Sequence, residues 1–558
     1  MALAFIVSAI LYERVQIAIQ GDLTQRRLFR RLTGRIDRNW SELSKIEVGE
    51  LGLESSMTAD DLDLIGDRSL LSWCSLAGTK AGKRVLVEQL TTYAEAATVI
   101  QRQEAARELS PQVEIRHRLM LQLWQLGSAS ESLDGFSDWA TQPTQSRPWV
   151  NWLSWIGPVC LMLGVAIAAI CFEPIPGACF WCGAALAAIG LLTNMVLMLG
   201  YIGVIHNAFK QIESHHGLEA TCQELLKSLS QMQSQSWLLL DIQRVLCDPK
   251  GNDSALAALP KLRWPMRLAG LRLNPTLTIP FLILQLVWLW DFRVYGWIER
   301  WRNRNSASVP QWLNCIGQLE AVLSSAAISH EYPNWTFPVS TLPKGVLFQA
   351  NQIGHPLIPD AMRVCNDLQM DRGLPLLVVT GSNMSGKSTL MRSIGVNVAL
   401  SRIGSPVCAE SFSCPAMELS TSIRVRDSLA DGVSFFMAEL KRLRQVVDAV
   451  QHSRQALHRP SLVILDEILQ GTNSRERQIA VSHVVQRLLL FDCLLLVSTH
   501  DLQLADADSF TGNCQVVHFR EHFEEVDGQS QMKFDYRMHP GPAPTTNALK
   551  LLELVGLR

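Results

Sequence analysis

A phosphate-binding loop is the feature that most constrains what this chain can fold into. Residues 376–389 read LLVVTGSNMSGKST, so an all-apolar run leads directly into the pattern Gly-x-x-x-x-Gly-Lys-Ser. We expect the run to be a buried parallel strand and the residues after the loop to form a helix, which leaves the N–H groups of the loop facing a polyphosphate. A chance glycine-rich loop would lack that context, so the pattern predicts an α/β domain with a phosphate site.

Positions within the loop have separate expected tasks. Gly381 and Gly386 permit the tight turn, while Lys387 reaches the β- and γ-phosphates. Ser388 places its hydroxyl on Mg²⁺. ATP and Mg²⁺ are therefore the expected cofactors, and no further small-molecule substrate is inferred. The expected nucleotide-binding residues are Gly381, Ser382, Asn383, Met384, Ser385, Gly386, Lys387, Ser388 and Thr389.

Two more apolar runs end in residues suited to hydrolysis. SLVILDE at 461–467 ends in Asp466, an expected Mg²⁺ ligand, and Glu467, expected to orient or deprotonate the attacking water. CLLLVSTH at 493–500 ends in His500, expected to hydrogen-bond the γ-phosphate or the lytic water. Because ligands lie beyond the carboxyl ends of the strands in an open α/β sheet, the three runs together predict one ATPase site.

Length and charge bound the rest of the chain. At 558 residues it is too long for one core. Its 50 Lys and Arg nearly balance 52 Asp and Glu, so any contact with a polyanion must be local. The 13 cysteines are expected to be reduced cytosolic thiols, apart from Cys179 and Cys182, whose apolar context favours membrane packing over redox chemistry.

A long uncharged stretch predicts a transmembrane hairpin over residues 148–205. From residue 148 to 201 only Glu173 is charged, and it lies in a turn rich in proline and glycine. The turn separates segments 150–172 and 178–204, each of which exceeds the length of about 20 residues that a hydrocarbon core requires. The alternative is a buried helical pair in a soluble protein.

Positive charges flank this hairpin and are absent from its turn. The flanking residues are Arg116, Arg118, Arg147 and Lys210. Since basic residues near membrane segments favour the cytosolic side, we expect both flanks and the ATP site in the cytosol, at an inner or plasma membrane.

Two shorter apolar runs are less decisive. MALAFIVSAILY at 1–12 is too short to span a membrane, so it is either the tail of a longer span or an interfacial anchor. IPFLILQLVWLW at 279–290 falls in an ambiguous length class and is interpreted as a core helix.

Six arginines follow the first apolar run at helical spacing. They are Arg26, Arg27, Arg30, Arg31, Arg35 and Arg38. A cationic helix next to a membrane segment is expected to touch anionic lipid headgroups, and nucleic acid is the alternative partner.

These patterns divide the chain into five parts. We expect an apolar anchor at 1–12, a helical region with the basic stripe at 13–147, the hairpin at 148–205, a helical lever or core region at 206–335 and an ATPase domain at 336–558. The fold class is α plus α/β, with a transmembrane hairpin in the helical part.

Four motifs carry a family resemblance. They are TGSNMSGKST, DSLADGVSFFMAEL, LDEILQGTNS and STHD, and a tail, YRMHPGPAPTTNALKLLELVGL, follows them. Together they resemble the ATPase domain of the MutS DNA mismatch-repair superfamily, firmly over about 340–558 and loosely before it. The layout with a hairpin resembles a membrane-anchored MutS-like branch. The resemblance implies a P-loop, ABC-type fold with a mainly parallel sheet and Mg²⁺-dependent ATP hydrolysis.

The resemblance also implies a homodimer with composite sites. Ser434 is similar to the serine that reaches the γ-phosphate in trans, so hydrolysis would depend on closure of the dimer. The residues that match the loop crossing the same interface are Gly471, Thr472, Asn473 and Ser474.

Two departures from the family bear on function. No mismatch-reading domain is recognisable before residue 60, and the family's adenine-stacking aromatic, expected shortly before Asn366, is replaced by the stretch 363–365. The sequence therefore leaves two functions open. One is a DNA clamp tethered to a membrane, and the other is an ATP-driven switch that acts on a membrane or protein partner without DNA.

Overall fold

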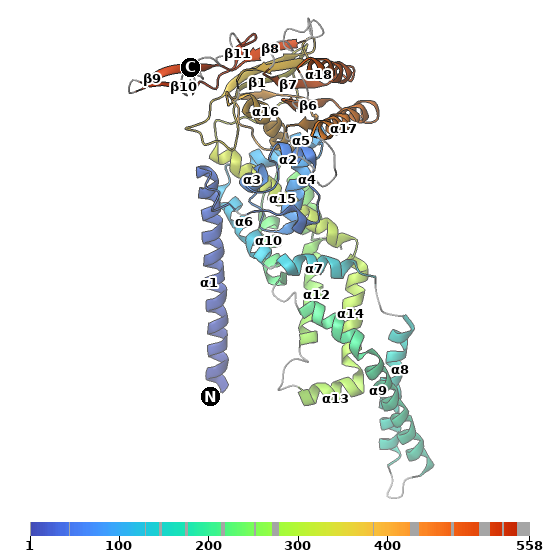
Figure 1. The fold of residues 1–558 in the computed structure, drawn as a ribbon. Coiled ribbons are helices and arrows are strands. Elements are labelled where there is room, and N and C mark those ends of the chain that lie inside the picture. Colours follow the sequence, from blue (N-terminus) through green and yellow to red (C-terminus); the bar gives the residue numbers. More distant parts are fainter. Residues whose placement is uncertain are drawn as a thin grey trace.

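The computed structural model describes most of the chain. The described residues are 2–43, 45–128, 130–143, 148–172, 177–213, 218–249, 251, 253–270, 278–382, 384–423, 435–469, 474–500, 514–526 and 529–543. They form an α/β domain at one end, a helical body beneath it and a helical hairpin that projects away from both (Figure 1).

The N-terminal part is helical. Its first helix, α1 (Ala2–Asp37), runs without a break across the expected limit at residue 12 and stands beside the body, with its N-terminus pointing away from the α/β domain (Figure 1). The following elements are η1 (Val48–Leu51), α2 (Met57–Asp61), α3 (Leu70–Cys74), α4 (Lys80–Thr91), α5 (Ala96–Leu109), α6 (Val113–Ser128) and α7 (Ser130–Thr141). Ser56, Ser69 and Thr79 begin α2, α3 and α4 by accepting a backbone N–H, as N-cap residues do.

The predicted hairpin consists of α8 (Pro148–Ile170) and α9 (Ala178–Glu213). Their apolar windows, with mean hydropathy 2.2 and 2.0, are long enough to cross a membrane. Many of their large apolar side chains are exposed, as lipid-facing side chains would be.

Glycines bring these two helices into close contact. A Cβ atom at Gly164 would lie 2.3 Å from the backbone nitrogen of Ala187, and one at Gly190 would lie 2.5 Å from that of Leu161. Only glycine permits this approach, and small residues at helix contacts are typical of membrane helices.

The helical body packs around one long helix, α15 (Ser308–Glu331). Its elements are α10 (Leu218–Gln231), α11 (Trp237–Cys247), α12 (Ala255–Gly270), α13 (Thr278–Trp288), α14 (Trp290–Asn305) and α15 (Ser308–Glu331). The interpretation of 279–290 as a core helix is wrong, because Ile279, Leu282 and Ile283 of α13 are 73%, 56% and 59% exposed. The length of an apolar run alone does not separate a core helix from a surface helix.

The described part of the α/β domain contains three sheets. Its strands are β1 (Val346–Ile353), β2 (Asn366–Asp371), β3 (Leu376–Thr380), β4 (Ser411–Ser413), β5 (Glu418–Ser422), β6 (Ser461–Asp466), β7 (Leu494–Thr499), β8 (Cys514–His518), β9 (Glu521–Val526), β10 (Gln529–Phe534) and β11 (His539–Pro540). The main sheet has the order β11-β8-β3-β7-β6-β5, in which only β11 is antiparallel to its neighbour. The sheet is therefore mainly parallel, as expected.

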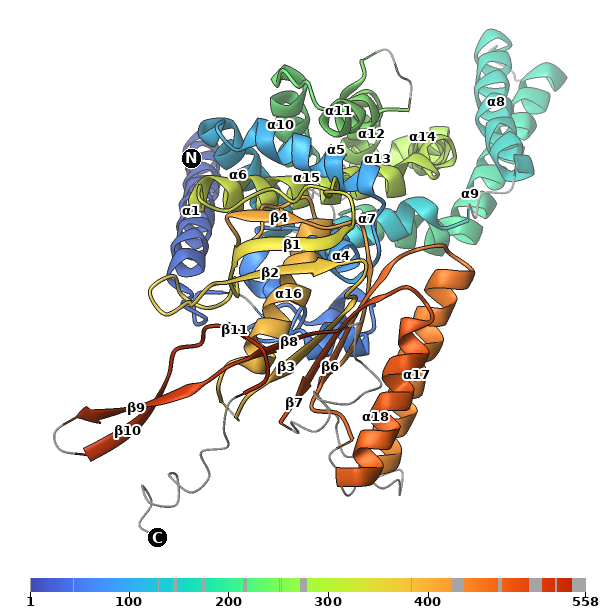
Figure 2. The ribbon, with the colours of Figure 1, turned by 90° about the horizontal axis from the view of Figure 1, so that it is seen from above.

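Helices cover both faces of this sheet. The helix after the phosphate loop, α16 (Lys387–Arg402), lies on one face, while α17 (Phe435–Gln455) and α18 (Ser474–Leu489) lie on the other (Figure 2). Because strand side chains alternate, Leu377 of β3 joins the core around α16 while Val378 joins the core around α17 and α18. Elements α2 to α4 complete the first of these cores, so the N-terminal part is packed against the ATPase domain.

The basic stripe on α1 faces the protein as well as the solvent. Arg31, Arg35 and Arg38 are 4%, 0% and 7% exposed, so the expected headgroup contact is wrong for these three. Arg31 donates to the carbonyl oxygens of Ser72 and Ser75, and Arg35 forms an ion pair with Glu331. A buried guanidinium group needs hydrogen-bond or ion-pair partners within the protein, and a group that is buried in this way does not contact lipid headgroups. The other three arginines of the stripe, Arg26, Arg27 and Arg30, remain exposed.

Candidate nucleotide site

The phosphate loop lies between a buried strand and a helix, as predicted from its sequence. All five residues of β3 are buried, and α16 begins at Lys387. Gly381 and Gly386 have φ values of +138° and +113°, which favour glycine. A Cβ atom at Gly381 would lie 2.7 Å from the carbonyl oxygen of Phe519, so close packing also requires glycine at this position.

The loop lysine contacts both the loop and the acidic pair. Lys387 is 3% exposed, and its Nζ atom donates to the carbonyl oxygens of Gly381 and Ser382 over 2.9 and 2.8 Å. The same atom lies 3.3 Å from Oε1 of Glu467. The structure therefore brings together the phosphate loop and the end of β6, which are far apart in the sequence.

The acidic pair is held by the neighbouring strand. Ser498 of β7 donates its hydroxyl to Asp466, and the backbone N–H of Glu467 donates to the Oγ atom of Ser498 over 3.0 Å. Glu467 has a φ of +46°, a strained conformation for a residue with a side chain. His500, directly after β7, is exposed at the same edge of the sheet.

Two residues of the N-terminal part brace the site. Asp61 of α2 accepts hydrogen bonds from the hydroxyl of Thr421 and the backbone N–H of Ile423, and it pairs with Arg442 of α17. These contacts lie on both sides of the segment that carries the expected trans serine. Asp63 pairs with Arg392 of α16 over 3.2 Å, so the helix after the phosphate loop is also held.

An aromatic residue that was not predicted from the sequence lies against the loop. Tyr536 is 45% exposed, and a Cβ atom at Gly386 would lie 3.2 Å from its ring. Asn366 holds this segment by donating to the carbonyl oxygen of Tyr536 and accepting the N–H of Met538. The tail motif begins with this tyrosine, and that position in the motif was the sequence signal that could have indicated it. Arg363, in the stretch that lacks the family aromatic, instead contacts Asp360 and Cys408.

Several expected residues lie outside the described part of the chain. They are Asn383, Ser434, Gly471, Thr472 and Asn473. Of the remaining loop positions, Met384 is 84% exposed, Thr389 is exposed and Ser388 is half-buried. Ser474 begins α18.

The residues present suit a nucleotide with Mg²⁺. The hydroxyl of Ser385 is buried within the phosphate loop and has no hydrogen-bond partner among the described residues, so it is available to a phosphate oxygen. Carboxylate and hydroxyl oxygens, as at Asp466 and Ser388, are the ligands that Mg²⁺ prefers. Among the described residues no three His, Cys, Asp or Glu side chains gather to hold a metal.

An open parallel sheet that carries a phosphate loop and an acidic pair at one edge defines a P-loop ATPase domain. Comparison with known families places it more narrowly. Residues 377–558 match the family described as MutS domain V, so this part of the chain is a MutS-type ATPase domain.

Similar proteins share this region. The DNA mismatch repair protein MutS of Exiguobacterium sp. is 28% identical over 249 residues, and that of Lactobacillus gasseri is 30% identical over 248 residues. These alignments cover 44% and 43% of this chain but 28% and 27% of the relatives. The MutS protein of Natronomonas pharaonis is 27% identical over 254 residues. The chain thus spans less than a third of the length of the curated relatives it matches.

Proposed function

We propose that this chain binds and hydrolyses Mg²⁺-ATP as a membrane-anchored, MutS-like homodimer. The observation that carries the proposal is the 3.3 Å contact between Lys387 and Glu467, which joins the phosphate loop to the acidic pair. ATP with Mg²⁺ supplies the reacting phosphate and a charge that polarises it. Lys387 holds phosphate oxygens, Ser388 and Asp466 hold the metal, and Glu467 accepts a proton from the attacking water.

Dimer closure completes the site in this proposal. In it, Ser434 reaches the partner's γ-phosphate and the 471–474 loop lies at the same interface, as the MutS resemblance implies. Asp61 supports such a role because it fixes the backbone at Ile423 and the helix at Arg442, the two flanks of the segment that contains Ser434.

The membrane is the proposed location of the hairpin. Its two helices are long, apolar and closely packed through glycines, and Trp152 and Ile170 near the ends of the first span are 80% and 84% exposed. The ATPase domain then lies on the cytosolic side, where ATP is available. Lipid is accordingly a proposed partner.

DNA is the proposed ligand, because the relatives that share the ATPase domain are DNA mismatch repair proteins. The test is ATPase turnover of the detergent-solubilised protein with duplex, mismatched and branched DNA across a salt series. We expect stimulation that falls as salt rises, since phosphate contacts release counterions. Robust turnover that is indifferent to every DNA form would contradict a DNA role.

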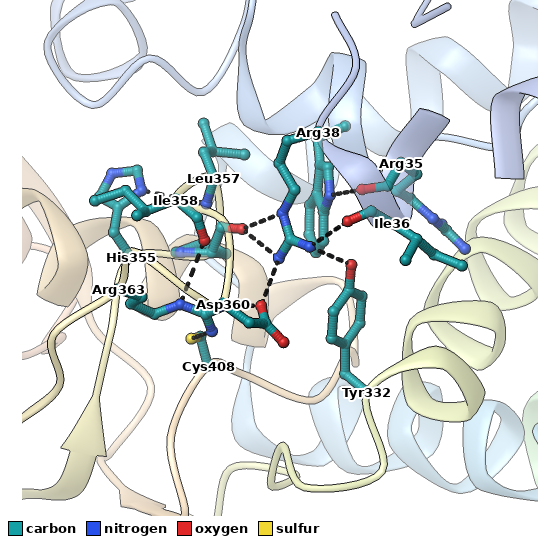
Figure 3. Close-up of polar contacts among 12 residues, drawn as sticks. Arg35, Ile36, Arg38, Tyr332, His355, Leu357, Ile358, Asp360, Arg363 and Cys408 are labelled. Carbon is teal, nitrogen blue, oxygen red and sulfur yellow. Dashed lines mark hydrogen bonds and ion pairs between the residues drawn. The ribbon is translucent and has the colours of Figure 1, made fainter. Parts of the chain in front are cut away.

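A second candidate function is an ATP-driven switch that acts on a membrane or protein partner. Arg38 at the end of α1 favours it, because this residue joins the long N-terminal helix to the ATPase domain (Figure 3). Its guanidinium donates to the carbonyl oxygen of Pro356 and to the hydroxyl of Tyr332 and pairs with Asp360. A movement of the 356–360 loop would therefore displace Arg38 and with it the end of α1.

Limited proteolysis or hydrogen exchange distinguishes the switch from a static anchor. In the full chain, addition of ATP to the Glu467→Gln variant should change amide exchange in α1 as well as in the phosphate loop. Exchange that changes only around the loop would remove support for the switch.

A further inference from the structure

Helix α13 exposes an apolar face beside the proposed membrane hairpin. Ile279, Leu282 and Ile283 share one face of the helix at spacings of three and four residues, and all three are exposed. At its other end, Asn194 of α9 donates to the carbonyl oxygens of Leu286 and Val287 over 2.8 and 3.3 Å. The C-terminal end of α13 is therefore held against the hairpin.

The position of this contact fixes the depth of α13. Asn194 lies sixteen residues beyond Ala178, the first residue of α9, which is about 24 Å along a helix. A hydrocarbon core is about 30 Å thick, so α13 meets the hairpin near the boundary on the ATPase side. With 11 residues, α13 is too short to span the core and suits a helix lying in the plane of that boundary.

The chain then turns out of this plane. Helix α14 leaves α13 at an angle of 72°, and Leu289 at the bend has a φ of +52°. One turn later the guanidinium of Arg293 lies 3.5 Å from the ring centroid of Trp155 of α8 and donates to the carbonyl oxygen of Ser154. Tryptophan and arginine are typical of membrane interfaces, so this contact marks the level of the headgroups.

A basic groove lies between α12 and α14, and its residue Arg300 is seven residues, or about 10 Å, beyond Arg293 along α14. It has a volume of about 460 Å³, and these two helices separate α13 from the rest of the body (Figure 1). Its charged and aromatic lining residues are Lys261, Trp264, Trp297, Arg300, Trp301 and Arg304, and no acidic side chain is among the described residues that line it. Trp264 and Trp297 are 67% and 40% exposed. Three cations and exposed tryptophans suit the phosphate of a lipid headgroup, which long basic side chains can reach from above the membrane surface.

We propose that α13 and the α12–α14 groove form one binding surface for anionic phospholipid. Helix α13 lies in the leaflet on the ATPase side, and Lys261, Arg300 and Arg304 bind the phosphate groups of lipids in that leaflet. The inference rests on the proposed membrane anchoring by α8 and α9. The apolar hairpin does not distinguish lipids by their charge, whereas the proposed groove would select anionic lipids.

The groove is tested by the lipids that the full chain retains. After reconstitution in nanodiscs of phosphatidylcholine and phosphatidylglycerol, the protein is extracted and its bound lipids are counted by native mass spectrometry. Phosphatidylglycerol should be enriched, and Arg300→Ala with Arg304→Ala should lower its retention by about 30-fold, the equivalent of about 1 kcal/mol per removed charge. Arg300→Lys with Arg304→Lys should retain the lipid.

A matched control removes two exposed charges elsewhere on the body. Lys227→Ala with Arg244→Ala, on α10 and α11, should leave lipid retention and ATPase turnover unchanged. Equal retention by the groove variant and this control would overturn the groove assignment. So would loss of salt-sensitive oligonucleotide binding in the groove variant at unchanged lipid retention, which would assign the groove to nucleic acid.

The position of α13 is tested separately by photocrosslinking in the same nanodiscs. Phosphatidylglycerol with a diazirine near the start of its acyl chain should label peptides from α13 together with α8 and α9. Labelling of α8 and α9 without α13 would overturn the in-plane helix and leave the anchoring intact. An absence of label from α8 and α9 would instead overturn the anchoring.

Discussion

The guanidinium of Arg38 donates two hydrogen bonds to the carbonyl oxygen of Pro356, over 3.3 and 3.0 Å. The two residues belong to the end of α1 and to the loop between β1 and β2, so the bond joins the N-terminal helix to the ATPase domain. Burial lowers the pKa of neighbouring His355 to about 4, which keeps the imidazole neutral and allows its Nδ1 atom to accept the N–H of Leu357. The loop between β1 and β2 is thus held by Arg38 from α1 and by the imidazole of its own residue His355 (Figure 3).

Loss of this junction should destabilise the chain. We expect Arg38→Ala to lower the free energy of unfolding by about 2 to 4 kcal/mol, because Pro356 and Tyr332 lose a buried partner. Thermal unfolding in detergent measures the effect. The exposed Arg27 of the same helix is the control, and Arg27→Ala should stay within about 0.5 kcal/mol of wild type. Equal melting of the two variants would contradict a structural junction at Arg38.

Removal of the carboxylate at position 467 should separate binding from hydrolysis. We expect Glu467→Gln to bind ATP but to hydrolyse it about 10²- to 10⁴-fold more slowly, the usual worth of a positioned general base. Steady-state turnover and equilibrium nucleotide binding are the two measurements. Glu476→Gln, on nearby α18, is a carboxylate control that should leave turnover unchanged. Normal turnover in Glu467→Gln would remove this residue from the proposed role.

A mixture of two inactive variants should regain activity if Ser434 acts in trans. Ser434→Ala removes the donated hydroxyl, whereas Lys387→Ala removes the phosphate loop lysine. In a mixed dimer, the intact loop of one subunit meets the intact serine of the other, so one of the two sites is complete. Turnover of the mixture, titrated over the ratio of the two chains, measures this. A mixture that never exceeds either variant alone argues against the trans assignment.

Residues near in sequence were predictable, and residues brought together by the fold were not. The run 376–380 coincides with β3 and the following residues with α16, because strand, turn and helix signals are all local. Helical spacing placed Arg31 and Arg35 on one stripe, but it carries no information on what that stripe meets. Glu331, the partner of Arg35, is 296 residues away.

The same limit applies to the nucleotide site. The ends of β3 and β6 were expected to meet, since parallel strands in one sheet align their carboxyl ends, and Lys387 does contact Glu467. Tyr536 was missed because its position beside Gly386 depends on Asn366, which is 170 residues away in the sequence. Its aromatic ring lies beside the phosphate loop, whereas the stretch 363–365 supplies no aromatic residue.

The ring of Tyr536 should contribute to nucleotide binding. We expect Tyr536→Ala to weaken ATP binding about threefold to tenfold, because a stacked aromatic pair contributes about 0.5 to 1.5 kcal/mol. Tyr536→Phe keeps the ring and should bind as wild type does. Equilibrium titration with a fluorescent ATP analogue distinguishes the two. Weakening by both variants alike would assign the effect to the hydroxyl and not to stacking.

A buried carboxyl group should make stability depend on pH. Glu320 of α15 is 2% exposed and accepts the backbone N–H groups of Gly78 and Thr79 over 2.7 and 3.1 Å. Burial raises its pKa from 4.5 to about 7. Below about pH 4.5 the group is protonated in both the folded and the unfolded chain. As the pH rises to about 7, only the unfolded chain loses the proton, so the free energy of unfolding falls by up to about 3 kcal/mol and then levels off.

Glu320→Gln should remove this pH dependence, because the amide oxygen still accepts the two backbone N–H groups and nothing remains to ionise. We expect the variant to match wild type near pH 5 and to melt at an increasingly higher temperature than wild type as the pH approaches 8. Thermal unfolding at four pH values between 5 and 8 measures the difference. Glu104→Gln, at an exposed position of α5, controls for the loss of a charge and should follow wild type throughout. If Glu320→Gln follows wild type as well, the buried group is not the source of the dependence. A wild type that stays more stable than Glu320→Gln by the same amount from pH 5 to pH 8 would mean that the pKa of Glu320 is not raised, since an ionised carboxylate would then stabilise this contact throughout the range.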